Sequence, residues 1–126
     1  MPVRVGLSAV AHMEVTESDT ATALGTGDVP VLATPRVVNL AEEATVQAVA
    51  NDLDDDSATV GYRVQLDHLA PTAVGGQVHA EAILESVEGR RLTFRVSVSD
   101  GRGLVAAGRI TRVVVERDRF LDKAGS

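Results

Sequence analysis

The chain has 126 residues with 12 basic and 18 acidic side chains, which give a formal net charge of −6. This charge opposes electrostatic binding to nucleic acid or an anionic membrane, and the absence of cysteine excludes disulfides, thiolate metal sites and cysteine nucleophiles. The length suits a single domain over residues 1–126. Because no apolar run reaches the length of a membrane span and the N-terminus lacks a signal peptide, we expect a cytoplasmic protein with no membrane or nucleic-acid partner.

The first third of the chain predicts a weak strand, an irregular segment and then a helix. Alternating valines favour a strand over residues 3–15, and the glycines and proline between residues 16 and 33 are typical of irregular chain. A helix is expected over about 34–51. Thr34 is its expected N-cap, and Pro35 would occupy the first helical position, where the missing N–H costs nothing.

Beyond this helix, apolar residues recur at every second position, which is typical of half-buried strands. The pattern predicts a strand that ends at His68 and further strands over about 77–87, 92–98 and 104–115, while the polar tail 117–126 is expected to fray. The inward-facing positions are expected to be Tyr62, Val64, Leu66, His68, Val78, Ala80, Ala82, Leu84, Leu92, Phe94, Val96 and Val98. This order indicates an α+β hotdog fold, in which an antiparallel β-sheet wraps around one central α-helix.

Glu42 breaks the pattern of the predicted helix. On a helical wheel it lies among Val38, Val46 and Val49, in the middle of an apolar stripe, whereas Glu43 falls on the face expected to meet water. A carboxylate on a buried stripe needs a partner and is a candidate for acid–base chemistry. We expect replacement by glutamine to leave the fold intact and to raise stability, because an amide is easier to bury than a carboxylate.

His68 breaks the pattern of the first strand after the helix, because it occupies an inward position. It is a candidate acid–base partner for Glu42, with a hydrogen-bonded structural role as the alternative. His79 has the outward parity and His12 lies in a poorly patterned strand, so both are expected at the surface. The histidines lack metal-ligand spacing, and the acidic run 52–56 lacks the glycine and final glutamate of a calcium loop, so no metal site is expected.

Thr34, Glu42 and His68 are separated by 8 and 26 positions, a pattern that resembles the Thr–Glu–His triad of the fluoroacetyl-CoA thioesterase family. The resemblance covers about residues 34–115. It implies a hotdog acyl-CoA thioesterase that needs no metal or organic cofactor and forms a homodimer with active sites at the subunit interface. Thr34, Glu42 and His68 would be catalytic, and Gly61 matches a glycine that lets the acyl group approach the strand backbone.

One departure from the family concerns the acyl group. The fluoroacetyl enzyme has a phenylalanine lid shortly before the threonine, where this chain has Asp28, and no phenylalanine precedes Phe94. We therefore expect hydrolysis of a small or medium acyl-CoA thioester to a carboxylate and CoA, without fluoroacetyl specificity. Glu42 could act as nucleophile or as a general base on water. The alternatives are a non-catalytic hotdog protein that binds acyl-CoA or another small ligand, and a hotdog enoyl-CoA hydratase.

Overall fold

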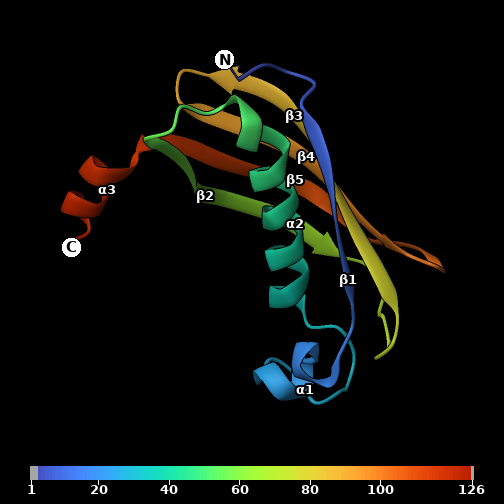
Figure 1. Ribbon diagram of the computed structural model, residues 1–126. Helices are drawn as coiled ribbons and strands as arrows, with labels where there is room; N and C mark the ends of the chain where they lie inside the picture. Colours follow the sequence, from blue (N-terminus) through green and yellow to red (C-terminus); the bar gives the residue numbers. More distant parts are fainter. Residues whose placement is uncertain (1–2, 126) are drawn as a thin grey trace.

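A computed structural model, which describes residues 3–125, has one five-stranded sheet curved around a long helix (Figure 1). Neighbouring strands are antiparallel, and their order is β1-β3-β4-β5-β2, so β1 and β2 form the two edges. This confirms the predicted α+β arrangement. The strands are β1 (Ser8–Glu14), β2 (Ser57–His68), β3 (Gln77–Glu88), β4 (Arg91–Asp100) and β5 (Gly103–Glu116), and the central helix is α2 (Thr34–Val49).

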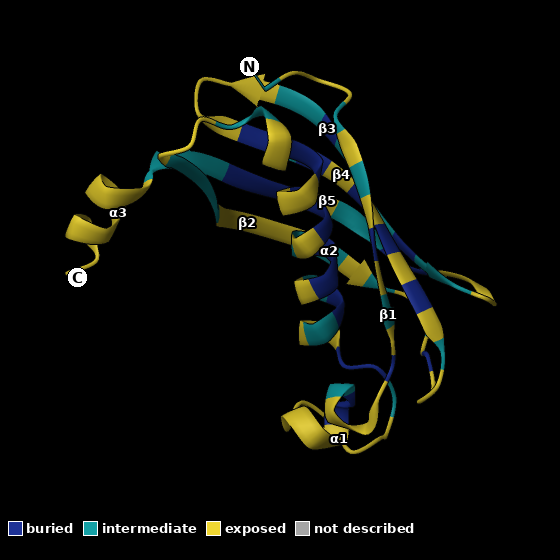
Figure 2. Ribbon diagram, viewed as in Figure 1, coloured by how far each residue is buried: buried dark blue, intermediate teal, exposed yellow. Residues whose placement is uncertain are grey.

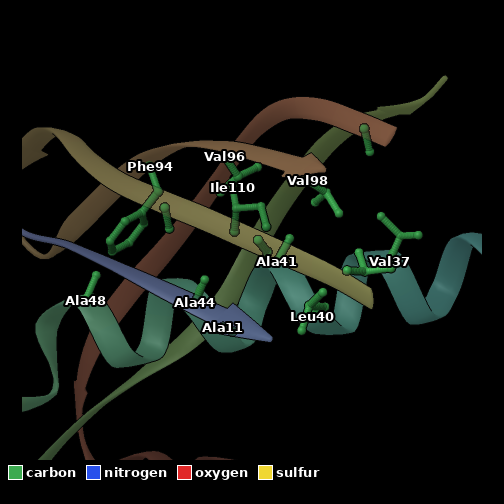
Figure 3. Packing of buried hydrophobic residues seen from close by; sticks show 14 of the residues in the cluster. Ala11, Val37, Leu40, Ala41, Ala44, Ala48, Phe94, Val96, Val98 and Ile110 are labelled. Carbon is green, nitrogen blue, oxygen red and sulfur yellow. The ribbon is translucent and has the colours of Figure 1, made fainter. Parts of the chain in front are cut away.

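The core lies between α2 and the inner face of the sheet. Alanines at positions 41, 44 and 48 of α2 are buried, and Phe94, Val96 and Ile110 face them from β4 and β5 (Figure 3). The inward positions predicted for β3 and β4 are all buried, which confirms the alternation read from those strands. Small side chains on the helix allow it to lie close to the sheet, so that polar groups on its flanks can reach the strands.

The helical wheel placed the wrong face of α2 toward the core. The buried face consists of Val37, Leu40, Ala41, Ala44, Thr45, Ala48 and Val49. Figure 2 shows that α2 has a buried face and an exposed face. Val46 is 43% exposed, and Glu42 has intermediate burial, at the boundary between the two faces. The helical wheel took the valines as the marker of the buried face, but the residues that lie against the sheet include the alanines of α2. Glu42 is therefore half-buried, and the prediction that it lies in the middle of the buried stripe is wrong.

A β-bulge changes the parity of β2. The register with β5 shifts between Gly61 and Arg63, so both Gly61 and Val64 point to the inner face while Tyr62 has no partner on β5. Tyr62 is 51% exposed, and the Arg91 guanidinium lies 4.6 Å from its ring centre. The prediction that Tyr62 faces inward is wrong for this reason. A bulge inserts one residue without a period-two signature, so strict alternation cannot detect it.

The ends of several elements also differ from the sequence predictions. The helix α2 has Ala33 as N-cap, so Thr34 already lies in its first turn and makes no cap hydrogen bond. The prediction of Thr34 as N-cap is wrong by one residue, a common uncertainty at helix ends. The observed first strand is shorter than the predicted range of 3–15, because β1 begins at Ser8.

Four short elements complete the fold between residues 3 and 125. They are the 3-10 turns η1 (Glu17–Asp19) and η2 (Ala50–Asp52) and the helices α1 (Ala21–Leu24) and α3 (Arg117–Lys123). The expectation of a fraying tail is wrong, because the Glu116 carboxylate accepts hydrogen bonds from two backbone N–H groups and caps α3. Among residues 3–125, no helix is long and apolar enough to cross a membrane.

Candidate active site

The first turn of α2 meets the end of β2 through a hydrogen bond between two predicted site residues. Thr34 Oγ1 and His68 Nδ1 are 2.8 Å apart. His68 pairs with Ala106 on the inner face of the sheet, which confirms its inward parity. Its other ring nitrogen, Nε2, is buried and has no hydrogen-bond partner among the described residues. Nδ1 is therefore the ring atom through which His68 interacts with other groups at this position.

Thr34 and His68 border a hollow of about 330 Å³, here called the acyl hollow. It lies between the segment that precedes α2 and the segment that follows β2. None of its lining side chains is aromatic apart from the imidazole of His68, and most of them are apolar. The lining residues are Ala21, Thr26, Gly27, Val29, Val31, Leu32, Ala33, Thr34, His68, Leu69, Ala70 and Pro71.

Glu42 has a different set of neighbours, two turns further along α2. Its Oε2 accepts a hydrogen bond of 2.9 Å from Arg112 Nη1, and one third of its side chain is exposed. A Cβ atom on Gly61 would lie only 2.7 Å from the same oxygen. Gly61 thus leaves the space that the carboxylate occupies, which is a structural reason for glycine at a position that the sequence analysis assigned to substrate contact.

Arg112 is a residue of this site that the sequence analysis missed. Its side chain is 8% exposed, and its Nε and Nη2 donate to the side chain and backbone oxygens of Thr59, both at 2.9 Å. Burial lowers the pKa of the guanidinium below its ordinary value, and the Glu42 charge opposes this effect. The alternation along β5 could have indicated that Arg112 points inward, because it shares the inward parity of Ile110.

The two pairs lie apart within one chain. Glu42 lies eight positions after Thr34 on the helix, which corresponds to about 12 Å along its axis. Seven residues of strand separate Gly61, which lies beside Glu42, from His68, and they span roughly 20 Å. One chain therefore brings Thr34 together with His68 and Glu42 together with Gly61, but it does not bring Glu42 to His68.

The remaining sequence predictions concern surface residues and metal sites. Glu43, His79 and His12 are exposed, as predicted, and the rings of the two histidines face each other across β1 and β3 with centres 6.0 Å apart. Over residues 3–125, no group of three or more acidic, histidine or cysteine side chains is arranged to hold a metal ion.

Comparison with known proteins identifies the family. The family model described as fluoroacetyl-CoA-specific thioesterase (FlK) matches residues 15–118, which is most of the chain. The chain belongs to this family. The match includes Thr34, Glu42, Gly61, His68 and Arg112 within its bounds.

Individual members of the FlK family and its structural neighbours are similar to this chain to different extents. The fluoroacetyl-CoA thioesterase of Streptantibioticus cattleyicolor is 39% identical over 90 residues, which are 71% of this chain but only 65% of that protein. A solved structure of the fluoroacetyl-CoA thioesterase FlK matches with a TM-score of 0.92 and 32% identity, over 98% of this chain and 96% of that one. A hot-dog-like protein from Thermanaerovibrio acidaminovorans matches with a TM-score of 0.87 and 26% identity, over 95% and 89%. The fold is the hotdog fold, as predicted.

The contact with Arg112 reverses the effect on stability that the sequence predicted for replacing Glu42 by glutamine. We predict that Glu42→Gln lowers the free energy of unfolding by about 1–3 kcal/mol, because the buried guanidinium loses its counter-ion, with the lower end favoured since Glu42 is partly in solvent. Glu43→Gln is the matched control and should leave stability unchanged. Thermal melts of both variants provide the measurement, and an unchanged or raised Tm for Glu42→Gln would contradict the importance of the ion pair.

Proposed function

We propose that the protein hydrolyses acyl-CoA thioesters, with Thr34, Glu42 and His68 as the catalytic residues. The observation that carries this proposal is the hydrogen bond between Thr34 and His68 in the lining of the acyl hollow. It supplies a hydroxyl and an imidazole beside an apolar space, at the positive end of a 16-residue helix. Membership of the FlK family supports the same reaction class.

The hydroxyl of Thr34 is suited to bind the carbonyl oxygen of the thioester. When His68 carries its proton on Nδ1, this N–H donates a hydrogen bond to Thr34 Oγ1. The hydroxyl hydrogen of Thr34 then remains free to bind the substrate. The developing oxyanion would then lie near the first turn of α2, where the helix dipole favours negative charge. His68 exchanges protons at Nδ1, because its Nε2 is enclosed by the protein.

Two balanced routes lead to the products, and both use the Glu42 carboxylate. As a general base, Glu42 takes a proton from water while the water oxygen bonds to the carbonyl carbon; the C–S bond then breaks and a proton is transferred to the CoA sulfur. As a nucleophile, a Glu42 oxygen bonds to that carbon as the C–S bond breaks, and water then cleaves the mixed anhydride. Each route converts one thioester and one water into one carboxylate, one CoA thiol and one proton. Transfer of oxygen from labelled Glu42 to the product would identify the nucleophilic route in which water attacks Cδ of Glu42 in the anhydride.

The separation of Glu42 from His68 within one chain leads us to include a homodimer in the proposal. The strand β2 is an edge strand of 12 residues, and much of its length is exposed (Figure 2). Exposed edge strands pair readily with another strand. Val64 near the middle of β2 is 40% exposed although it points to the inner face, which suits burial against a second copy.

A two-fold arrangement of two β2 strands would unite the separated groups. An isologous antiparallel pairing centred midway between Gly61 and His68 sets Gly61 of one chain beside His68 of the partner subunit. Glu42, which lies over Gly61, would then approach the Thr34–His68 pair of the partner subunit. Each dimer would contain two such sites, both at the subunit interface. No metal or organic cofactor takes part in either route.

The acyl hollow supports a substrate range wider than fluoroacetyl-CoA. Its segment before α2 presents Val29 and Val31, with Asp28 adjacent, and no phenylalanine covers it. Aliphatic side chains have no means to distinguish a C–F from a C–H bond strongly, since a hydrophobic pocket rejects a near-isostere by only about 1–3 kcal/mol. We therefore propose small and medium acyl groups as substrates.

The range of substrates can be tested with a panel of acyl-CoAs. We predict thiol release from acetyl-CoA, fluoroacetyl-CoA and medium-chain acyl-CoAs, with kcat/KM for fluoroacetyl-CoA within about 100-fold of that for acetyl-CoA. A preference for fluoroacetyl-CoA above 100-fold would contradict the proposed range. Binding of an acyl-CoA without thiol release would instead indicate a binding protein. A loss of enoyl-CoA absorbance, which reports the addition of water to the double bond, would indicate a hydratase.

The catalytic roles can be tested with variants of the three residues. Glu42→Gln removes the anion at nearly constant shape and should abolish most hydrolysis, whereas His68→Ala should lower kcat by roughly 10²–10⁴-fold. Thr34→Ala should cost less, and Thr34→Ser should be close to wild type because it keeps the hydroxyl. Glu43→Gln and His79→Ala are the matched controls at exposed positions. Steady-state assays on folded variants decide the matter, and full turnover by Glu42→Gln would refute the mechanism.

A further inference from the structure

Two histidines lie side by side on the outer face of the sheet, the face turned away from α2. His12 of the edge strand β1 is directly opposite His79 of β3 in the antiparallel register, and Figure 1 shows these strands next to each other. Ala11, Val78 and Ala80 on either side of them are buried in the core, so the two imidazoles point outward, and both are exposed. The histidines are 67 positions apart in the sequence, and only the pairing of the strands makes them neighbours.

The two rings are close enough to share one metal ion. Their centres are 6.0 Å apart and their planes are tilted by 41°, so the rings are not stacked on each other. Two imidazoles on one tetrahedral zinc ion have ring centres about 5 Å apart, since each Zn–N bond is about 2.0–2.1 Å long. The Cβ atoms of directly opposite residues lie about 4.5–5.5 Å apart. Rotation of the two side chains therefore brings one nitrogen of each ring to the ion without a change in the backbone.

The surroundings of this pair favour a cation. The adjacent outward positions hold two carboxylates and no basic side chain, and a negative surface potential raises the local concentration of cations. Glu14 accepts a hydrogen bond of 2.9 Å from Gln77, so these two side chains bind each other and leave the imidazoles accessible. The adjacent outward positions are Val10, Glu14, Gln77, Glu81 and Ser99.

We propose that His12 and His79 bind one divalent transition-metal ion of the zinc and copper class. Imidazole is an ordinary ligand for these ions, whereas calcium and magnesium prefer oxygen ligands. No third histidine or carboxylate within residues 3–125 is arranged to complete the site, so water fills the remaining positions on the ion. The ion fastens the edge strand β1 to β3 and stabilises the folded chain. The site lies on the opposite face of the sheet from α2, and the inference does not rest on the proposed function.

Calorimetric titration with Zn²⁺ tests this inference, on protein without a histidine tag and at about pH 7.5, where free imidazole is mostly neutral. We expect one zinc ion per chain. His12→Gln and His79→Gln should each weaken binding by about tenfold or more, because a single imidazole then remains and the benefit of two linked ligands is lost. His68→Gln removes the third histidine of the chain and is the matched control, which should bind zinc as the wild type does.

Thermal melts provide a second readout, since the ion binds the folded chain across two strands. Free zinc at ten times its dissociation constant should raise the Tm of a domain of this size by about 5 °C. Replacing either His12 or His79 by glutamine should remove this rise, and a chelator should reverse it in the wild type.

Three results would overturn the inference. The first is no zinc binding by the wild type, or binding that His12→Gln and His79→Gln both leave unchanged. The second is the loss of binding in a folded His68→Gln variant, because the ion would then be held elsewhere. The third is a rise in Tm with Ca²⁺ equal to that with Zn²⁺, which would indicate binding by the carboxylates of Glu14 and Glu81 rather than by the imidazoles.

Discussion

The close contact of α2 with the sheet is the constraint on which the rest of the structure depends. Alanines on the helix and small residues on the strands allow the helix backbone to approach the inner face. Gly61 provides the space for the Glu42 carboxylate, and a side chain on Gly108 would collide with the backbone of β2 at Gln65. A larger residue at position 61 would push β2 away from α2, and one at position 108 would push β5 away from β2. These tight contacts bring Thr34 to His68, and they bring Glu42 to Gly61 and Arg112.

This contact is apolar at its centre and polar at two places along the flank of α2. At the first turn, Thr34 binds His68 at the end of β2. Two turns later, Glu42 binds Arg112, which is in turn fixed to Thr59 at the start of β2. The helix is thus joined to one edge strand at both places. Because that strand runs the full distance between them, the groups proposed for catalysis form two separate clusters within one chain, and the proposed dimer would join them across the exposed edge of β2.

The sequence was sufficient for the parts of the fold that follow regular periodicity. The inward positions of β3 and β4 alternate without interruption and were predicted correctly, as was the inward parity of His68. Tyr62 was misplaced because a bulge adds a residue to β2, and Glu42 was placed too deep because the wheel gave weight to valines over alanines. Arg112 shares the inward parity of Ile110, but its partners Thr59 and Glu42 come from a strand and a helix distant in the sequence, and only the structure shows these contacts. The separation of Glu42 from His68 depends on three-dimensional distances that spacing along the chain does not contain.

The central claim is that a thioesterase site forms from Glu42 of one chain and the Thr34–His68 pair of another. The direct measurement is the activity of a heterodimer of Glu42→Gln and His68→Ala chains, co-expressed with two different tags and purified through both. One of its two sites would contain an intact Glu42 and an intact His68, so we predict about half of the wild-type activity per dimer. Each variant alone should be nearly inactive. A heterodimer as inactive as its parents, or the failure of the two chains to co-purify, would contradict the account.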